Sequence, residues 1–525
     1  MDEKTIFQGQ APNPIAPNVS NPLSQSPGPE NPQPVQPQPN QAISPPPPPF
    51  QPAAIPMTEP LPPSSQEASP PPPSEIPPVS PPGGEIETEN PKRGGFKLKK
   101  ILLILGSVII LLLLIFGGYL LFQRFQSSKS EKVTLDYWGL WEDSKVMDLV
   151  ISDFQRNNPN ITIKYSKQDI NEYRQKLVQR IGNGSGPDIF RFHNSWPIML
   201  SSYLLPLSSD IISTKEFKDI FYPVAQNDLI KNGAILGIPL EIDTLALYIN
   251  DDLFKAAGIG VPQRWEDFAS ISAALTVKDD EGKIKKAGVA LGTANNIEHA
   301  SDIISLLFAQ NGVDLENISS NEQNLSQALQ YYTSFATSDS KVWDENQDSS
   351  LLAFSKGNLG MYFGYSYDLF SILALNPNLN FKIVSVPTLA GRRITIASYW
   401  VEGVSVKSKH QKEALLFLKF LAKKETEQKL YTEESKTRLF GEPYARVDLR
   451  ESLKDNAIVY PFVEQASNSR STYFSDSTFD QGINEELKTY LYNAVSSIVS
   501  DNTSPETAAG TLSKGFDQTL AKYGK

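Results

Sequence analysis

The sequence predicts an α/β fold, with a parallel sheet flanked by helices, in the part of the chain from residue 133 to residue 525. The first observation is a pattern. Between residues 133 and 192, β-type runs alternate with amphipathic helical runs in the order strand, helix, strand, helix, strand, which is typical of a parallel sheet. The second is a contrast in composition, because 29 of the 41 prolines precede residue 92. The chain therefore has at least two regions of different composition, and the later region is globular.

Residues 1–91 form a Pro/Gln/Ser/Asn-rich tail with runs such as "SPPPPPF" and "SPPPPSEIPP". Proline lacks an amide donor and disfavours helix at the residue before it, and the scarcity of aromatic residues leaves no core to offset the entropy of ordering. We expect a disordered tail with polyproline II character. It is either a docking site for a proline-binding partner or a solvated spacer, and its composition favours the spacer.

An apolar segment follows the tail. Residues 101–122 contain no charge, and at a rise of 1.5 Å per residue they span about 33 Å as a helix, enough to cross a bilayer. A buried soluble helix is rarely this long without a charge. A cleaved signal peptide fits poorly, because the preceding region is far too long and no A-x-A site follows. We therefore expect one transmembrane helix, with a basic juxtamembrane segment at residues 92–100 and a linker at residues 123–132.

Basic residues predict the orientation of this helix. Five precede it (Lys92, Arg93, Lys97, Lys99 and Lys100) and three follow it (Arg124, Lys129 and Lys132). The excess on the amino side places the tail in the cytoplasm and residues 123–525 outside the cell membrane.

Whole-chain counts exclude several classes of function. The formal charge of −11 argues against a nucleic-acid-binding surface. The absence of cysteine excludes disulfides, thiolate metal sites, cysteine nucleophiles and a lipid-modified cysteine anchor. The three histidines, His193, His299 and His410, lie far apart in sequence without metal-ligand spacing, so we predict neither a metal nor a cofactor.

The elements of the globular part follow from hydrophobic periodicity. Strands are predicted at residues 133–138, 160–165 and 187–192. Between them lie helices at residues 143–159, ended by Pro159, and at residues 169–184. The buried stripe of the first helix is predicted to be Val146, Leu149, Val150 and Phe154, and that of the second Tyr173, Leu177 and Ile181.

Unusual residues stand at the carboxyl ends of the first and third strands, where ligands gather in such sheets. Trp138, Trp141 and Glu142 follow the first strand, and His193, Asn194 and Trp196 follow the third. Aromatic faces beside hydrogen-bonding groups suit sugars. Each tryptophan could instead be a core residue, because tryptophan is highly buried on average. Three tryptophans at one end of the predicted sheet favour a pocket.

A second candidate site lies in "GIPLEIDTLALYINDDLFKAAG", residues 237–258. Residues 245–249 read as a strand. Asn250 is a good N-cap and Gly258 a good helix stop, so residues 250–257 form a short helix in which Asp251 and Asp252 favour the first turn. Glu241 and Asp243 have no such structural role.

Five segments in order resemble the extracellular solute-binding proteins of the maltose/oligosaccharide type, the receptors of ABC importers. They are "GNGSGPDIFRFHNSW", "ALYINDDLFKAAGIGVPQRWEDF", "FSKGNLGMYFGYSYDL", which looks like the family's hairpin, "SYWVEGVSVKSKHQKEALLFLKFLAKKETEQKLY" and "GEPYARVDL". The resemblance covers residues 133–525. One departure is that the family's paired tyrosines before the asparagine are Tyr248 and Ile249 here.

The resemblance implies a two-lobed, periplasmic-binding-protein-like fold with an interlobe cleft, preceded by the single transmembrane helix and the disordered Pro-rich tail. The first lobe would comprise about residues 133–242 and 402–447, and the second about 246–398 and 450–525. Asp243 matches a carboxylate that binds sugar hydroxyls from the interlobe crossover, with Glu241 as a second candidate. Asn194 matches a polar contact on the first lobe, Tyr367 an aromatic residue in the hairpin of the second, and Trp400 lies on the second crossover.

The implied function is a membrane-tethered receptor that captures a mono- or oligosaccharide by lobe closure and passes it to ABC permease subunits. An enzyme is one alternative, because Glu142, Glu241, Asp243 and Glu402 could supply a glycosidase pair, but the sequence shows no such pairing. A tethered sensor or adhesin without a transporter is the other alternative. A single helix with a disordered tail offers no evident bistable element for signalling.

Overall fold

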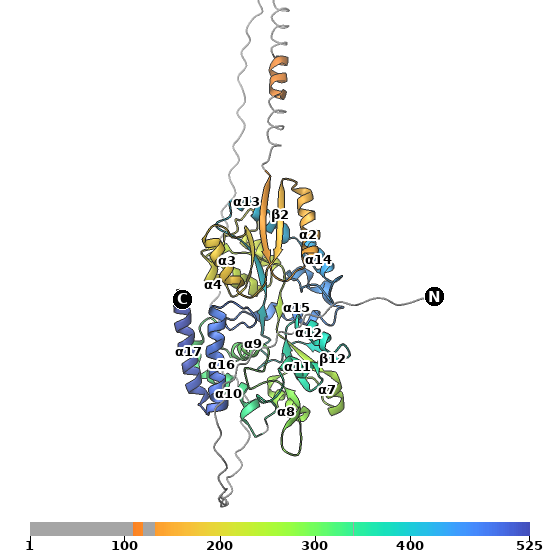
Figure 1. Ribbon diagram of the computed structural model, residues 1–525, viewed down its shortest axis with the longest axis vertical. Coiled ribbons are helices and arrows are strands. Elements are labelled where there is room, and N and C mark those ends of the chain that lie inside the picture. The colour runs from red at the N-terminus through yellow and green to blue at the C-terminus, as the bar shows by residue number, and fades with distance from the viewer. Residues whose placement is uncertain (1–108, 119–131, 340) are drawn as a thin grey trace, which may run out of the picture. The chain divides into compact units, whose positions relative to one another are not determined.

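The computed structural model of this protein describes residues 109–118, 132–339 and 341–525 (Figure 1). The predicted Pro-rich tail, the basic segment and nearly all of the linker lie outside the described residues. Of the predicted transmembrane segment, residues 109–118 are described. They are helical, and Ile109 to Phe116 expose between 54% and 68% of their surface. Within the described ranges, no helix is both long enough and apolar enough to cross a membrane.

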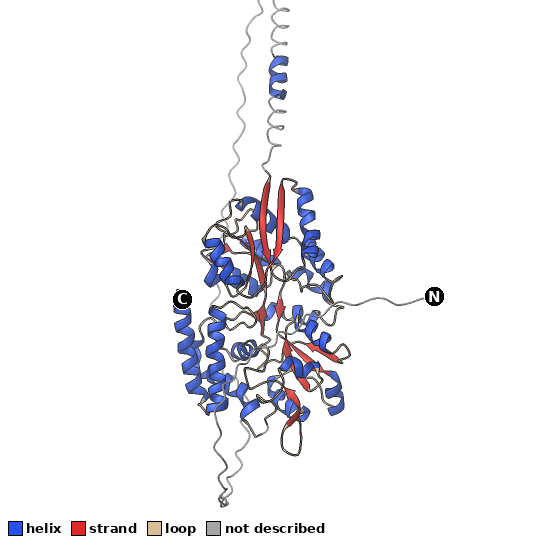
Figure 2. Cartoon of the chain, viewed as in Figure 1, coloured by secondary structure: helices blue, strands red, loops and turns tan. Residues whose placement is uncertain are grey.

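The first lobe is built on a five-stranded sheet in the order β2-β1-β3-β14-β6 (Figure 2). β1 pairs in parallel with β2 and β3, as the sequence predicts, whereas β14 runs antiparallel to β3 and β6. The strands are β1 (Val133–Gly139), β2 (Ile161–Lys167), β3 (Ile189–His193), β6 (Ile238–Pro239) and β14 (Trp400–Val404). The accompanying elements are α2 (Ser144–Asn157), α3 (Tyr173–Gly182), α4 (Pro197–Leu200), α5 (Thr214–Ile220), α6 (Pro223–Leu229), β4 (Ile230–Lys231), β5 (Ala234–Ile235), α13 (Gln411–Leu421) and α14 (Lys424–Glu434).

The second lobe is built on another five-stranded sheet, in the order β12-β8-β11-β10-β9. Its strands are β8 (Ala246–Asn250), β9 (Val277–Lys278), β10 (Ile284–Val289), β11 (Leu359–Gly364) and β12 (Phe381–Val384). Its helices are α7 (Asp251–Ala257), α8 (Trp265–Leu275), α9 (Ala300–Gln310), η1 (Ile318–Asn321), α10 (Glu322–Thr337), α11 (Ser350–Ser355), α12 (Asp368–Leu375), α16 (Ile483–Asp501) and α17 (Pro505–Ala521). α16 and α17 pack against each other and against α10, as Figure 1 shows.

Short strands connect the two lobes. β7 (Asp243–Thr244) lies between β6 and β8, and β13 (Thr395–Ser398) immediately precedes β14. β13 pairs antiparallel with β7 and parallel with β15 (Ser469–Arg470), so the crossing segments form one small sheet. The chain crosses again between α14 and α16, through η2 (Val447–Leu453), α15 (Tyr460–Glu464) and η3 (Ala466–Asn468). A two-lobed α/β molecule with discontinuous lobes results.

The local predictions are mostly confirmed. In α3, Tyr173, Leu177 and Ile181 are buried. Asn250 caps α7 by accepting a hydrogen bond from the Leu253 amide, and Gly258 ends the helix with a φ of 67°, a conformation that favours glycine.

Two local predictions are wrong. Leu149 does not belong to the buried stripe of α2, because it is 46% exposed and Met147 and Ile151 face the sheet instead. The segment around Tyr367 is not a hairpin. β11 lies between β8 and β10 in the sheet, and the chain continues from β11 directly into α12.

Candidate functional site

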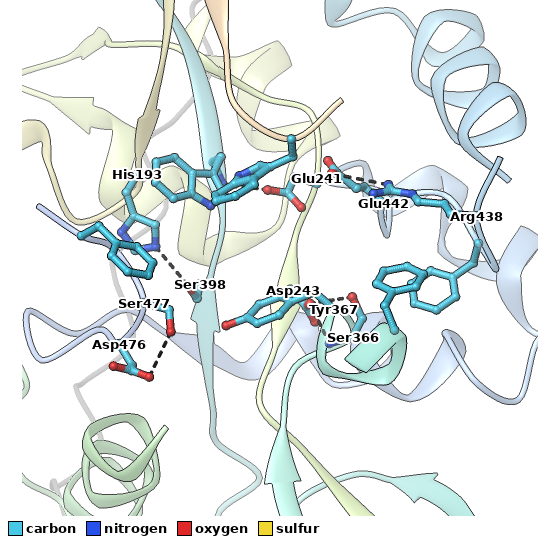
Figure 3. A pocket seen from close by; sticks show the side chains of 15 residues that line it. His193, Glu241, Asp243, Ser366, Tyr367, Ser398, Arg438, Glu442, Asp476 and Ser477 are labelled. Atoms are coloured by element: carbon cyan, nitrogen blue, oxygen red, sulfur yellow. Dashed lines mark hydrogen bonds and ion pairs between the residues drawn. The ribbon is translucent and has the colours of Figure 1, made fainter. Parts of the chain in front are cut away.

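A cavity of about 430 Å³ opens where the chain crosses between the lobes (Figure 3). We call it the interlobe cavity. The first lobe contributes Trp141 and His193, and the crossing segments contribute Glu241, Asp243, Ser398 and Trp400. The second lobe contributes Ser366, Tyr367, Phe370, Asp476, Ser477 and Phe479. The segment after α14 adds Arg438, Phe440 and Glu442.

Trp400, the first residue of β14, is the centre of the aromatic wall of the cavity. Its ring meets Trp141 edge-on with 5.5 Å between centroids, and it meets His193 at 5.1 Å and Trp196 at 5.3 Å. Trp196 is fully buried behind Trp400, whereas Trp141 is half-buried and lines the cavity. Burial lowers the pKa of His193 to about 3, so this imidazole is neutral and exchanges hydrogen bonds with Ser195 and Ser398.

Tyr367 supplies the facing aromatic surface from the second lobe. Its ring stacks on Tyr365, with 5.6 Å between centroids and 13° between planes, and 42% of the residue is exposed. Phe479, from the loop before α16, is similarly exposed at 43%. Two exposed aromatic side chains therefore line a cavity whose other wall is tryptophan.

Asp243 joins the two lobes. One carboxylate oxygen accepts a hydrogen bond from its neighbouring Thr244 amide at 2.8 Å. The other accepts from the Ser366 amide at 2.8 Å and from the Ser366 hydroxyl at 2.6 Å. Burial raises the pKa of Asp243 to about 7 against the lowering effect of these hydrogen bonds.

Glu241 and Glu442 lie together at another side of the cavity, with Arg438 beside Glu442 (Figure 3). Glu241 is 8% exposed, and one of its oxygens accepts a hydrogen bond from the Trp400 amide at 3.2 Å. Burial raises the pKa of Glu241 well above its usual value, and the neighbouring carboxylates, Glu442 foremost, raise it further. Arg438 lies 2.7 Å from Glu434 and 3.4 Å from Glu442.

A buried ion-pair network lies behind this wall in the first lobe. Arg191, on β3, is fully buried and contacts Glu142 at 2.5 Å and Glu402 at 2.6 Å. Burial raises the pKa of Glu402 to about 7, although Arg191 lowers it. Oxygens of Glu142, Glu434 and Glu442 lie within 4.8 Å of one another, the one such group among the described residues with the spacing to hold a metal ion. Arg191 and Arg438 already supply positive charge to this group.

A buried histidine contacts two aspartates in the segments that form the second-lobe side of the cavity. His299, just before α9, contacts Asp368 at 3.0 Å and Asp476 at 3.3 Å. Burial lowers the pKa of His299, but the two carboxylates raise it well above the usual value, so the imidazole is charged. Asp368 also accepts hydrogen bonds from the Tyr362 hydroxyl and the Tyr365 amide, which orients the segment that carries Tyr367.

The loop before α16 is strained where it lines the cavity. Ser477, Phe479 and Gln481 have φ angles of 55°, 50° and 43°, a region that residues other than glycine seldom adopt. Each such residue costs on the order of 1–3 kcal/mol and persists only where the surroundings enforce it. Asp480 accepts hydrogen bonds from three following amides, those of Gly482, Asn484 and Glu485. Arg174 of α3 donates to the Asp480 and Gln481 carbonyls from the first lobe.

Of the nine site residues that the sequence analysis names, the structure brings five to the interlobe cavity: Trp141, Glu241, Asp243, Tyr367 and Trp400. Their contact with a ligand stays a prediction. The other four, Trp138, Glu142, Asn194 and Trp196, do not line it.

Each of these four has another place in the structure. Trp138 lies within β1, where the Lys176 ammonium sits 5.0 Å from its ring. Glu142 pairs with Arg191, and Trp196 is core.

Asn194 lines a second cavity of about 470 Å³. It donates a hydrogen bond to Asp228 at 3.1 Å and to Ser471 at 2.9 Å, and it accepts one from the Tyr399 amide. Asn194, Tyr399 and Ser471 all donate hydrogen bonds to the same carboxylate oxygen of Asp228, so Asp228 has a structural role at the crossing segments. Burial raises the pKa of Asp228 to about 6.

Several residues of the cavity were not identified from the sequence. Ser366 and Phe370 lie within a segment that the resemblance covers, next to Tyr367, and His193 was noted only as a residue after the third strand. Arg438, Phe440 and Glu442 come from an irregular segment after α14, and Asp476, Ser477 and Phe479 from the loop before α16. Neither segment has the hydrophobic periodicity of a helix or a strand, so the periodicity did not predict that these residues lie at the cavity.

Comparisons with known proteins agree with this architecture. A family model described as "Bacterial extracellular solute-binding protein" matches residues 139–428, more than half of the chain. The "Multiple sugar-binding protein" of Streptococcus mutans is 24% identical over 330 residues, which is 59% of this chain and 75% of that protein. The structure of the GacH receptor of Streptomyces glaucescens, studied unliganded and with acarbose, superposes with a TM-score of 0.58 at 20% identity and covers 75% of this chain and 100% of that one. The sugar-binding protein MalE of Xanthomonas citri gives a TM-score of 0.62 at 17% identity and covers 74% and 98%.

Proposed function

The chain belongs to the bacterial extracellular solute-binding proteins, and on this premise we propose that it captures a carbohydrate in its interlobe cavity. The observation that carries the proposal is the composition of that cavity. Exposed or half-buried aromatic side chains (Trp141, Tyr367 and Phe479) line the same cavity as two carboxylates that can accept hydrogen bonds (Glu241 and Asp243). Sugars present apolar C–H faces that pack on aromatic rings, and their hydroxyls need polar partners.

Capture would occur by closure of the lobes. The small sheet of β7, β13 and β15 is the natural hinge, because short crossing segments absorb the backbone rotation when two lobes close on a ligand. Asp243 bonds to the second lobe from this hinge, and Glu241 bonds to the first residue of β14. A ligand that binds both carboxylates would be in direct contact with the crossing segments that carry them.

The proposed activity is binding without chemistry. Of the four carboxylates that the sequence offers for a glycosidase pair, Glu142 and Glu402 are paired with the buried Arg191 and do not line the cavity. Glu241 and Asp243 remain, and each accepts backbone hydrogen bonds that fix it in the crossing segments. A receptor uses such groups as acceptors for sugar hydroxyls.

We also propose that the chain is tethered to the membrane by residues 101–122 and that it delivers its ligand to ABC permease subunits. The tether is supported by the uncharged stretch in the sequence and by the exposed apolar side chains of the helical residues 109–118. Delivery is supported by the family. A tethered sensor or adhesin is the alternative, and the genes beside this one discriminate: permease genes favour import, and an isolated gene favours sensing or adhesion.

A thermal-shift screen of the full chain, purified in mild detergent, tests the carbohydrate proposal. A ligand that binds only the native state raises the melting temperature. The panel contains mono- and oligosaccharides, with amino acids and short peptides as controls. Stabilisation by at least one carbohydrate supports the proposal. Stabilisation by amino acids or peptides alone, or unchanged melting with every carbohydrate, would refute it.

A further inference from the structure

A cluster of buried glutamates lies beside the interlobe cavity, and two of its members, Glu241 and Glu442, line the cavity. Five glutamates, Glu142, Glu241, Glu402, Glu434 and Glu442, interact with two guanidinium groups, Arg191 and Arg438. Arg191 is shared by Glu142 and Glu402, and Arg438 by Glu434 and Glu442. All five carboxyl groups are largely buried, so water screens their mutual repulsion poorly.

Glu241 is the member of this cluster that lacks a cation of its own. Among the described residues, no lysine, arginine or histidine lies within ion-pairing distance of it, and its carboxylate accepts one hydrogen bond, from the Trp400 amide. It is nevertheless more than nine-tenths buried, and it lines the cavity beside Glu442 (Figure 3). Burial and the nearby Glu442 raise the pKa of Glu241, although Arg191 lowers it, so ionising this carboxyl group is costly. A cationic group delivered by the ligand would stabilise its charged form.

The aromatic lining suits a cation as well. Trp400 is next to Glu241, to which its amide donates a hydrogen bond, and its ring contacts that of Trp141. Aromatic faces attract ammonium groups through their quadrupole. The cavity already contains one example, because the Arg438 guanidinium lies 5.8 Å from the Phe370 ring. A neutral cavity-lining imidazole, His193, adds no opposing charge.

We propose that the carbohydrate captured by this protein carries a protonated amino group, which lies between Glu241 and Glu442 against the tryptophan wall. This inference rests on the proposed carbohydrate-binding function and specifies its ligand class. Hydroxyl groups alone would leave the Glu241 carboxyl group without a cation to stabilise its charged form. An ammonium group donates three hydrogen bonds and offsets one negative charge, and its bonds to carboxylates are about twice as strong as neutral ones.

Sugars that differ at one position test this proposal. Glucose, glucosamine and N-acetylglucosamine share one ring and carry a hydroxyl, amino or acetamido group at C2, and galactose and mannose give equivalent sets. Cellobiose-type disaccharides with the same three substituents extend the test to a two-ring ligand. Calorimetric titration of the full chain at about pH 7 should show that, in at least one set, the amino sugar binds about tenfold or more tightly than both neutral members. Added salt should reduce the preference.

Glutamine variants test whether Glu241 and Glu442 cause the preference for the amino sugar. Glu241→Gln and Glu442→Gln keep the side-chain shape and should each reduce the preference for the amino sugar about tenfold, with smaller effects on the neutral sugars. Glu427→Gln is the matched control, because Glu427 is a buried glutamate of α14 that does not line the cavity. Melting curves of all three variants establish that they are folded.

The outcomes separate this inference from the proposed function. If neutral sugars bind as tightly as amino sugars in every set that binds, the carbohydrate function stands and the cationic ligand is refuted. If the preference survives both substitutions, the placement of the amino group between Glu241 and Glu442 is refuted. If no carbohydrate binds, the proposed function itself is refuted, and this inference with it.

Discussion

Asp243 bonds to the second lobe from a crossing segment and also lines the interlobe cavity. It lies on β7, it is 3% exposed, and both of its hydrogen-bond partners in the second lobe come from Ser366. The sequence pattern showed only that Asp243 precedes a buried strand without an evident structural role, and the family resemblance assigned it to the crossover. Its hydrogen bond to the other lobe depends on the position of Ser366, which is 123 residues later in the chain. No local sequence pattern predicts that these two residues meet.

The pH dependence of stability tests the burial of Asp243. Its pKa is raised from 3.8 to about 7, so the folded state retains a proton that the unfolded state loses. Asp243 therefore contributes stability below about pH 4, and this contribution is lost as the pH rises through about 7. Asp243→Asn removes the titration. Denaturant unfolding of both proteins should show wild type losing stability relative to the variant between about pH 4 and 8, by at most about 4 kcal/mol. Parallel pH profiles would contradict the burial argument.

Two tryptophans that both contact Trp400 should have different roles. Trp196 is fully buried, so Trp196→Ala should lower the free energy of unfolding by about 3–5 kcal/mol. Trp141 is half-buried and lines the cavity, so Trp141→Ala should weaken carbohydrate binding with a smaller loss of stability. Melting curves and calorimetric titration on the same two variants distinguish these effects. Normal affinity in Trp141→Ala would place Trp141 outside the site.

At the scale of elements, strand boundaries explain which of the predicted strand-end residues line the cavity and which do not. β1 continues to Gly139, so Trp138 lies within the strand, on the same face as the exposed Thr134 and Asp136. Trp141 lies beyond the strand and is free to turn into the cavity. The sequence predicts the alternation of buried and exposed residues along β1. It does not fix the residue at which the strand ends, and that residue decides which tryptophan lies beyond it. Asn194 and Trp196 follow β3, yet they pack behind the crossing segments.

The turn from β11 to α12 depends on the charged His299, whose neighbours include three carboxylates, Asp302, Asp368 and Asp476. The folded-state pKa of His299 is raised, so its stabilising contribution is fully present below about pH 6.5. It is lost only as the pH rises through that higher folded-state pKa.

His299→Gln removes the charge and leaves Asp368 without its cation, whereas Asp476 keeps its ion pair with Lys488 at 2.9 Å. We expect the free energy of unfolding at pH 7 to fall by about 3–5 kcal/mol. Because Asp368 orients the segment that carries Tyr367, carbohydrate affinity should fall as well. Denaturant unfolding and titration measure both quantities. Unchanged stability at neutral pH would show that His299 is not the charged centre of this cluster.

At the scale of the whole molecule, the fold was more predictable than the site. Repeated strand–helix patterns predicted the three parallel strands of the first-lobe sheet, and five ordered segments indicated the two-lobed architecture. The site forms from four stretches of chain, around residues 141–193, 241–243, 366–400 and 438–479. Which residues line the site depends on how irregular segments pack. This packing depends on contacts between residues that are far apart in sequence.

The tether and its orientation make a prediction for intact cells. Protease added outside should remove residues 123–525 and spare the Pro-rich tail, because the basic residues that precede the apolar segment favour a cytoplasmic tail. Immunoblotting with antibodies to each part measures the outcome, and permeabilised cells provide the control in which both parts are accessible. A protected solute-binding domain would reverse the orientation.

The central claim is that the interlobe cavity binds a carbohydrate. Calorimetric titration of the best sugar from the thermal screen into wild type and Tyr367→Ala tests it most directly, because Tyr367 is 42% exposed and its removal should leave the fold intact. Trp138→Ala is the matched control, an aromatic residue that does not line the cavity. We predict that Tyr367→Ala weakens binding about tenfold while Trp138→Ala retains wild-type affinity. Full affinity in Tyr367→Ala, or an equal loss in Trp138→Ala, would contradict the account.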